Sequence, residues 1–201
     1  MSDSTSDHGR RRFLIGATTA LGAVGVGAVA IPFVSSMLPS ARAKAAGAPV
    51  EIDISRLESG MMLTSEWRGQ PVWIVSRTPD MLAQLAKNAD RLRDPNSDDS
   101  DQPDDCKNIN RSGPEHPEVL VVVGICTHLG CSPQDRMKAG NVAGMGDDWP
   151  GGFFCPCHGS KFDMSARVFK GVPAPLNMKI PPYQYLAGGK LLVGADKTKG
   201  A

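Results

Sequence analysis

Apolar and charged residues are unevenly distributed along the chain, and the longest uncharged run lies near its N-terminus. From Phe13 to Leu38 there are 26 residues without a charged side chain, and three arginines at 10–12 come directly before them. A run of this length exceeds the roughly 20 apolar residues that span a bilayer. The pattern predicts a single transmembrane helix within residues 1–38, oriented by the arginines with its N-terminus in the cytoplasm.

The processing of this N-terminal stretch has two interpretations. The sequence ARA at 41–43 is similar to the site at which secretory signal peptides are cleaved. The apolar run is much longer than the about 7–15 residues usual in such peptides, which favours a retained anchor. The sequence RRRFL at 10–14 resembles the twin-arginine export signal, although both flanking residues differ from the commonest ones. The same arginines are also explained by the orientation of an anchor alone.

The stretch that follows the apolar run shows no apolar periodicity. Its sequence, PSARAKAAGAP at 39–49, is rich in small residues and contains a proline at each end. Such a composition is typical of a tether rather than of a hydrophobic core. We expect residues 39–50 to form a flexible hinge and residues 51–201 to form the folded domain.

Beyond the hinge, the apolar residues occur in short β-branched and aromatic runs bounded by Gly, Pro or charge. These runs are VEIDISRL (50–57), QPVWIVSR (70–77), EVLVVVGIC (118–126) and GGFFCPC (151–157). YQYLAGGKLLVG (183–194) predicts a hairpin that turns at Gly188-Gly189. Many short strands without β–α–β alternation predict a mostly β fold, an antiparallel sandwich or barrel.

One segment after the hinge has helical periodicity. TPDMLAQLAKNADRLRD (78–94) places four apolar residues on one side: Met81, Leu82, Leu85 and Leu92. The next segment, DPNSDDSDQPDD (94–105), has six aspartates and no basic residue, and we expect a solvated loop there rather than a contact with a partner. The formal net charge of the 201-residue chain is only +1, so the composition does not indicate a nucleic-acid partner.

Two short boxes carry the candidate chemistry. CTHLGC (126–131) contains Cys-x-His, and CPCHGS (155–160) contains Cys-x-x-His, so each box offers one thiolate and one imidazole. Zinc sites with two cysteines and two histidines usually pair like with like. Boxes that mix the two types suit a [2Fe–2S] cluster with one iron on cysteines and the other on histidines. A zinc-stabilised binding module without redox function is the alternative.

The boxes resemble those of the Rieske iron–sulfur proteins of quinol-oxidising cytochrome bc complexes. The resemblance covers nearly the whole chain, including the N-terminal signal, the anchor and the hinge. Further matching segments are WRGQPVWIVSRT (67–78), GVPAPLN (171–177) and PPYQYL (181–186). It implies an antiparallel β-sandwich Rieske domain with one inserted helix and a small cluster-binding subdomain at about 124–176.

The resemblance also assigns the boxed residues. It implies that Cys126 and Cys155 bind one iron of a Rieske-type [2Fe–2S] cluster, and that His128 and His158 bind the other. It assigns the two remaining box cysteines, Cys131 and Cys157, to a disulfide. A disulfide there fits an exported domain, since such bonds persist in oxidising compartments. Cys106 has no role in either box, and we expect a reduced thiol there rather than a bridge to another chain.

Residues around the boxes have implied roles as well. Ser160 is expected to donate its hydroxyl to a cluster sulfur, which stabilises the added electron. Members with a high potential commonly carry tyrosine where this chain has Phe162, so we expect a lower potential here. The face that docks on cytochrome b is expected to contain Leu129, Gly171, Pro173 and Pro175.

The resemblance implies the function of an iron–sulfur subunit of a ubiquinol–cytochrome c reductase. The subunit takes an electron, with a proton, from ubiquinol at cytochrome b, and His158 rather than His128 accepts the quinol hydrogen bond. It passes the electron to cytochrome c1 and so contributes to proton translocation. The implied location is the inner membrane, with the head in the periplasm and the complex dimeric. The Rieske subunit of a periplasmic arsenite oxidase is the alternative, and a soluble Rieske ferredoxin is disfavoured by the anchor.

Overall fold

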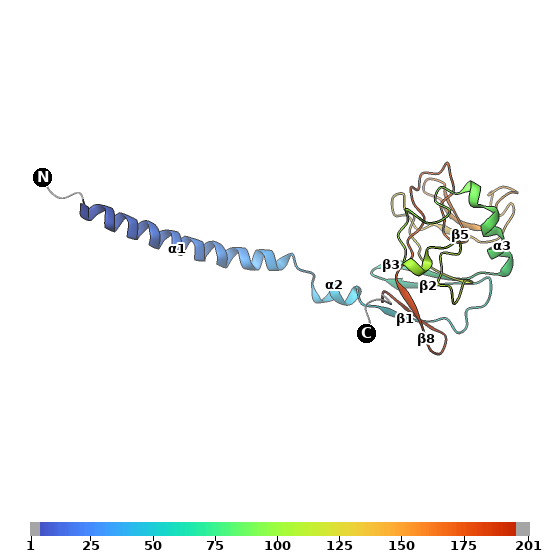
Figure 1. Cartoon of the computed structure of the whole chain (residues 1–201), viewed down its shortest axis with the longest axis horizontal. Helices are drawn as coiled ribbons and strands as arrows, with labels where there is room; N and C mark the ends of the chain where they lie inside the picture. Colours follow the sequence, from blue (N-terminus) through green and yellow to red (C-terminus); the bar gives the residue numbers. More distant parts are fainter. Residues whose placement is uncertain (1–4, 196–201) are drawn as a thin grey trace. The chain divides into compact units, whose positions relative to one another are not determined.

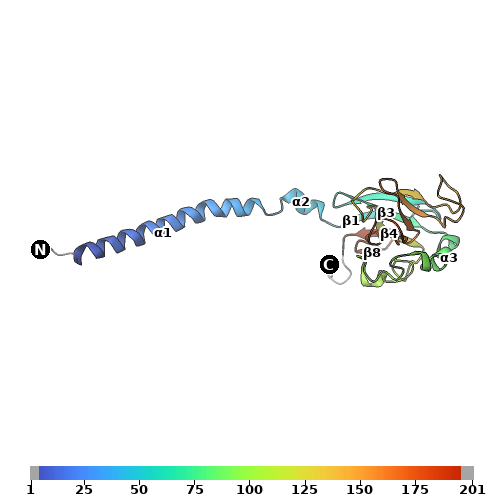
Figure 2. The ribbon, with the colours of Figure 1, turned by 90° about the horizontal axis from the view of Figure 1, so that it is seen from above.

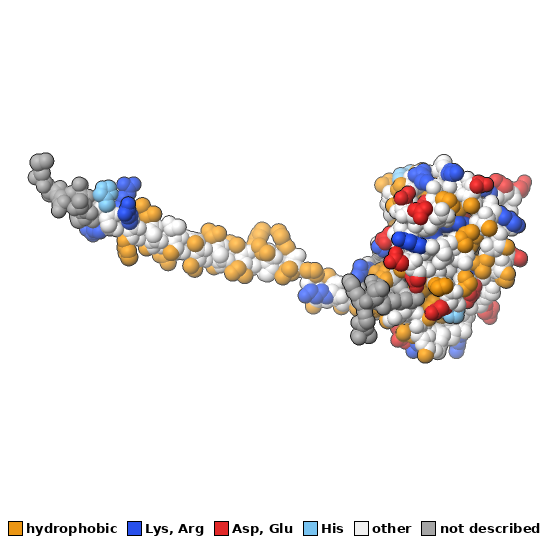
Figure 3. Space-filling view, in the orientation of Figure 1, with side chains coloured by type: hydrophobic (Ala, Val, Ile, Leu, Met, Phe, Trp, Pro, Cys, Tyr) orange, Lys and Arg blue, Asp and Glu red, His pale blue; other side chains and the backbone are white. Residues whose placement is uncertain are grey.

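The computed structural model describes residues 5–195, which divide at Ala45/Ala46 into two compact units. The first unit is dominated by α1 (Thr5–Ser36), a helix of 32 residues that is drawn as one continuous rod in Figure 1. Its most apolar 18 residues have a mean hydropathy of 2.0, and the helix is long and apolar enough to cross a membrane. Figure 3 shows apolar and small side chains along it, beyond its basic start. A helix that could span a membrane is therefore present where the sequence predicts the anchor.

A short helix interrupts the expected hinge. α2 (Ala41–Ala46) lies within residues 39–50, the stretch for which the sequence predicts a flexible hinge. Alanines, lysine and arginine have high intrinsic helix propensity. Ser40 caps the helix, because its Oγ accepts a hydrogen bond from the Ala43 amide at 3.1 Å. A short helix can therefore form in the predicted hinge although the segment has no apolar face, because its residues favour helix and its first turn is capped.

The head unit contains three antiparallel sheets of three strands each, which bears out the expected mostly β fold. The first joins β1 (Val50–Asp53), β9 (Lys190–Val193) and β8 (Tyr183–Leu186), and the second joins β2 (Met62–Trp67), β3 (Gln70–Ser76) and β4 (Val119–Val123). The third joins β5 (Gln134–Arg136), β6 (Gly152–Cys155) and β7 (Ser160–Asp163). The predicted hairpin is β8–β9, whose turn contains Gly188 and Gly189 at positive φ.

The main apolar core connects the second sheet to the third. All five residues of β4 are buried, and Trp73 of β3 stacks on Phe153 of β6 with ring centroids 5.2 Å apart. Gly124 follows β4 and lies against this indole, where a Cβ would come within 2.3 Å of Trp73. Because only glycine permits this approach, the backbone that leads into Cys126 is held against the core.

The inserted helix is shorter than predicted. α3 (Pro79–Lys87) begins at the cap Thr78 and ends before Asn88, and a 3₁₀ turn, η1 (Ala89–Arg91), follows. Leu92 then adopts an extended backbone and pairs with Phe169 instead of continuing the helix. It belongs to a second small cluster with Phe169 and Trp149. Figures 1 and 2 both place α3 at the end of the head unit opposite β1.

The acidic segment is only partly solvated, which corrects the expectation for residues 94–105. Five of its six aspartates are exposed, but Asp94 is 6 % exposed. Asp94 is surrounded by donors: its carboxylate accepts hydrogen bonds from the Asp98 amide at 2.8 Å and the Ser100 hydroxyl at 2.6 Å. A carboxylate can be buried where donors replace its water shell. The start of this segment is thus part of the fold.

Candidate metal centre

The two boxes form two compact loops. The first loop follows β4 and is closed by hydrogen bonds from the Cys126 amide to the Cys131 carbonyl at 2.8 Å and from the Gly130 amide to the Cys126 carbonyl at 3.1 Å. The second loop is the turn of the β6–β7 hairpin, in which Cys155 pairs with Ser160. Hydrogen bonds within each loop thus fix the backbone that carries the candidate ligands.

A disulfide joins the tips of the two loops. Cys131 and Cys157 are bonded, with a Cα–Cα distance of 6.7 Å. The sulfur atoms of Cys131, Cys155 and Cys157 lie within 4.8 Å of one another. Since two of these sulfurs are already bonded to each other, Cys155 is the member of this group that can bind a metal.

The remaining candidate ligands form two pairs. Cys126 and Cys155 are both buried, at 2 % exposure each, and their thiols interact. The His128 and His158 rings have centroids 4.7 Å apart and are nearly perpendicular. Within the described part of the chain, Nδ1 of His128 is a buried polar atom with no hydrogen-bond partner. A sulfur pair, an imidazole pair and an unsatisfied nitrogen fit a [2Fe–2S] cluster held by cysteines at one iron and histidines at the other.

The environment of Cys126 disfavours a thiolate unless a cation is bound. Burial raises the pKa of the Cys126 thiol, and the neighbouring Cys155 contributes in the same direction. Hydrogen bonds from the His128 amide and the Ser160 side chain lower the pKa but do not offset the burial. A bound metal ion reverses this balance, because a coordinating thiol is deprotonated.

Two buried residues of β7 lie beside the second loop. Ser160 is fully buried, and its Oγ accepts a hydrogen bond from the Ala174 amide at 3.0 Å. The hydroxyl proton of Ser160 is therefore not used in the contact with Ala174 and can be donated to another acceptor. Phe162 is also fully buried, pairs with Phe153 across the hairpin and has no group that can donate a hydrogen bond.

The outer side of the two loops is apolar and exposed. Leu129 is 72 % exposed and Leu176 is 38 % exposed, and Gly171, Pro173 and Pro175 are also exposed. His158 is exposed on its loop, whereas His128 is partly buried. The hydroxyl of Thr127 donates to the Leu176 carbonyl at 2.6 Å and so joins the first loop to the segment 171–177. The four residues expected on the docking face are thus all accessible.

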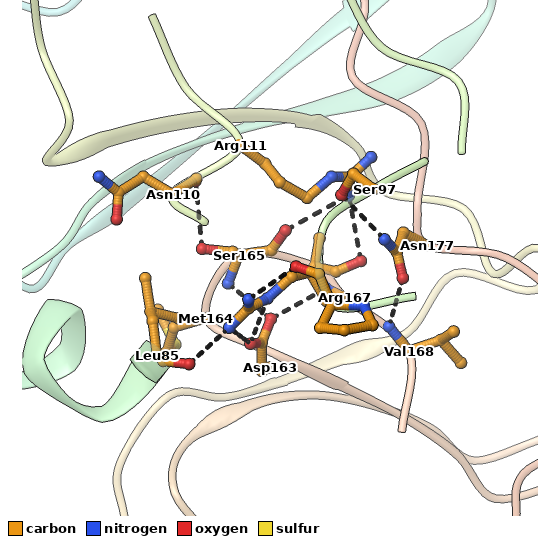
Figure 4. A network of polar contacts seen from close by, with 12 residues as sticks. Leu85, Ser97, Asn110, Arg111, Asp163, Met164, Ser165, Arg167, Val168 and Asn177 are labelled. Carbon is orange, nitrogen blue, oxygen red and sulfur yellow. Dashed lines mark hydrogen bonds and ion pairs between the residues drawn. The ribbon is translucent and has the colours of Figure 1, made fainter. Parts of the chain in front are cut away.

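Three buried arginines support the site from the inner side, and the sequence analysis did not identify them. Arg77, Arg111 and Arg167 are each at most 1 % exposed. Arg167 forms an ion pair with the fully buried Asp163 at 2.7 Å and also donates to the Leu85 carbonyl at 2.8 Å (Figure 4). We call Arg77, Arg111, Asp163 and Arg167 the polar core.

The polar core binds backbone from distant parts of the chain. Arg77 donates to the Met164 carbonyl at 3.2 Å and to Ser165 Oγ at 2.8 Å, and Arg111 donates to the Ala166 carbonyl at 3.2 Å. Burial lowers the pKa of Arg77 and of Arg111 to about 10, while Asp163 opposes this shift, so both stay charged at neutral pH. The segment that follows β7 is therefore held by guanidinium groups.

Cys106 lies away from both boxes. It is fully buried, and its Sγ is 3.6 Å from the hydroxyl oxygen of Tyr183, a contact in which the thiol donates. Burial raises the pKa of Tyr183, so this phenol is neutral. A sulfur in this position is not accessible to a second chain, which agrees with the expected thiol.

Comparison with known proteins identifies two family matches. The family described as "Ubiquitinol-cytochrome C reductase Fe-S subunit TAT signal" matches residues 1–40, and the family "Rieske [2Fe-2S] domain" matches residues 104–183. The first match confirms the twin-arginine interpretation of RRRFL. The second spans both boxes and most of the segments around them.

Similar proteins extend the match to nearly the full length. The chain is 57% identical to the ubiquinol-cytochrome c reductase iron-sulfur subunit of Allochromatium vinosum, over 94% of this chain and 89% of that protein. It is 44% identical to the subunit of the same name from Blastochloris viridis, over 96% of this chain and 97% of that one. A solved structure titled "Hyperthermophilic respiratory Complex III" is 28% identical, covers 87% of this chain and 96% of its own, and has a TM-score of 0.44. The chain belongs to the family of ubiquinol–cytochrome c reductase iron–sulfur subunits, which carry a Rieske [2Fe–2S] domain.

Proposed function

We propose that this protein is the iron–sulfur subunit of a quinol-oxidising cytochrome bc complex, and that it takes an electron and a proton from ubiquinol and passes the electron to cytochrome c1. One observation carries this proposal. Two adjacent loops, each with a cysteine and a histidine, expose one histidine next to an apolar surface. Family membership, at 57% identity over nearly the full chain, supports it.

The cluster would be held by the two pairs of side chains found in the loops. Cys126 and Cys155 supply the thiolates for one iron, and the imidazoles of His128 and His158 bind the other. When bound, the cluster supplies a one-electron acceptor whose potential is raised by its neutral histidine ligands. Cys131–Cys157 keeps the two loops together around it.

His158 is the better placed of the two histidines to meet the quinol. Its side chain is exposed, whereas that of His128 is partly buried. A histidine that binds metal through one ring nitrogen keeps the other nitrogen to accept or hold a proton. His158 therefore accepts the hydrogen bond of the quinol hydroxyl and takes up its proton.

The exposed apolar face next to His158 suits a partner embedded in the membrane. Leu129, Gly171, Pro173 and Pro175 carry no charge, so burying these four residues desolvates no ionised group. We assign this face to cytochrome b, which offers the quinol site. Release from it lets the head reach cytochrome c1.

The N-terminal unit anchors the head and lets it move. Residues 1–38 form the signal and the retained anchor, residues 39–50 the hinge, and residues 51–201 the Rieske domain. Export through the twin-arginine route places the head on the periplasmic side of the inner membrane. We further propose that the whole complex is dimeric, so that two copies of this subunit work in one assembly.

The alternative of an arsenite oxidase subunit is less well supported. The N-terminal match is to the signal of the cytochrome c reductase subunit, and the relatives that align over nearly the full length carry that name. A binding module stabilised by zinc is not compatible with membership of the Rieske family.

Purification of the protein with its partners tests the proposal. Membranes are extracted in mild detergent, the subunit is isolated by an affinity tag, and reduced-minus-oxidised spectra are recorded. We expect bands of both b-type and c-type haem, together with quinol-dependent reduction of cytochrome c. A molybdenum-containing partner without b-type haem would contradict the quinol assignment while leaving the Rieske cluster in place.

A further inference from the structure

Asn177 is a buried residue at the end of the segment 171–177, and its side chain is fully hydrogen bonded. It is 1 % exposed. Its Nδ2 donates to the Asp94 carbonyl at 2.9 Å and to Ser97 Oγ at 3.0 Å, and its Oδ1 accepts from the Val168 amide at 2.8 Å. Figure 4 shows Asn177 between Ser97 and Val168. The side chain therefore bridges the acidic segment and the start of the loop that follows β7.

The acidic segment also holds the backbone of Asn177. The Asn177 amide donates to Ser100 Oγ at 3.1 Å, and the Ser100 hydroxyl donates to the Asp94 carboxylate at 2.6 Å. Asp94, Ser97 and Ser100 are all buried, at 9 % exposure or less. A network in which each buried group has a partner is rigid, and losing one member leaves others unsatisfied.

The loop between Val168 and Asn177 carries the amide that contacts Ser160. Its ends are closed by the Asn177–Val168 bond and by the Met178 amide, which donates to the Ala166 carbonyl at 3.0 Å. In its middle, the buried Ala174 donates its amide to Ser160 Oγ at 3.0 Å. Because the amide hydrogen occupies one side of the hydroxyl oxygen, this contact turns the Ser160 proton away from Ala174.

We infer that Asn177 is a positioning residue for the redox site, and that Asp94 acts on the site through it. Held by the acidic segment, Asn177 fixes the loop so that the Ala174 amide directs the Ser160 hydroxyl toward the Cys126 sulfur. The inference rests on the proposed function in that a bound cluster is the group that Ser160 stabilises. It gives the buried part of the acidic segment a role in setting the potential at a site that it does not touch.

The sign of the effect of Asp94→Asn separates positioning from simple electrostatics. Removing a negative charge alone stabilises the reduced state and raises the potential. Weakening the anchor of Asn177 loosens the Ser160 hydrogen bond and lowers the potential. We expect Asp94→Asn to lower the equilibrium constant for reduction roughly threefold, about 28 mV for one electron. Asp98→Asn removes the same charge from an exposed neighbour and is expected to leave the potential unchanged or slightly higher.

A double-mutant cycle tests whether Asn177 acts on the potential through Ser160. In Asn177→Ala, which changes no charge, the equilibrium constant for reduction is expected to fall roughly tenfold, about 59 mV. In a Ser160→Ala background the same change is expected to have less than about a twofold effect, since residues in one hydrogen-bond network are not additive. Potentials are measured by redox titration of the cluster signal in electron paramagnetic resonance, in membranes that contain the whole complex.

Hydrogen exchange gives a readout that does not involve the electron. Faster exchange of the Ala174 amide is expected in Asp94→Asn and Asn177→Ala, and not in Asp98→Asn. If Asn177→Ala fails to fold, Asp94→Asn and Ser97→Ala carry the test. A rise of the potential in Asp94→Asn, or equal effects of Asn177→Ala with and without Ser160, would overturn the inference. These results do not depend on the haem partners, so failure of the proposed function is recognised separately, by the spectra of the purified assembly.

Discussion

The inner and outer sides of the cluster-binding loops are built on opposite principles. On the inner side, the polar core and the Asn177 contacts satisfy most of their buried polar groups, with Nε of Arg111 as an exception, and they leave hardly any surface exposed. On the outer side, His158 and the apolar residues around Leu129 are accessible and make few contacts. The difference fits an inner side that fixes the geometry of the site and an outer side that takes the docking role proposed above. Substitutions on the two sides should therefore fail in different ways.

The largest effect is expected from breaking the polar core. In Arg167→Met, the carboxylate of Asp163 stays fully buried without its partner, and the free energy of unfolding should fall by about 3–5 kcal/mol. The same substitution at Arg91, which pairs with Asp148 at 3.0 Å on the surface, should cost less than about 1 kcal/mol. Denaturant titration of the full-length protein in detergent measures both. Similar costs for the two variants would show that the inner side is not specially stabilising.

A smaller effect is expected from adding a donor on the inner side. Phe162→Tyr introduces a hydroxyl beside the second loop, and a hydrogen bond to a cysteine sulfur stabilises the reduced site by about 1 kcal/mol. The midpoint potential should rise by about 40 mV for one electron. Redox titration of the variant and the wild type in the same membranes measures the shift. An unchanged midpoint would mean that the new hydroxyl does not reach the sulfur.

Substitutions on the outer side are expected to have the smallest effect on the free energy of unfolding. They should instead lower the rate of quinol oxidation. Leu129→Asn changes a side chain that is 72 % exposed, so the free energy of unfolding should change by less than about 0.5 kcal/mol. Quinol oxidation should slow on the order of tenfold, because the substitution removes the most exposed apolar side chain of the proposed docking face. Met61→Asn, at a residue 52 % exposed and outside the cluster-binding loops, is the matched control. A loss of turnover in both variants would argue against a specific docking face.

The apolar part of the fold and the chemistry of the boxes could be predicted from the sequence. Strands such as β3 and β4 are continuous apolar runs, and the two boxes contain their own ligand types at short spacing. The polar core could not be predicted, because Arg77 finds its partners 87 and 88 residues away, at Met164 and Ser165, and periodicity carries no such information. An isolated arginine in a sequence has the pattern of a surface residue.

Contacts between residues far apart in the sequence also explain why local patterns gave wrong predictions at the acidic segment and at the end of the inserted helix. Six aspartates predict solvation, yet the first of them is buried, because the nearby Ser100 hydroxyl and the distant Asn177 amide group help to replace its water. The apolar Leu92 has helical spacing but pairs with Phe169 as an extended residue and packs in the cluster that also contains Trp149. Long-range contacts override local preference at both places.

The polar core has a mechanical consequence for the head unit. Its guanidinium groups join α3, the acidic segment and the backbone after β7, so bending these elements relative to one another would require buried charges to lose their partners. These three parts of the head are therefore expected to move together. With the hinge that we propose at residues 39–50, the redox centre would change its position by motion of the head as one body.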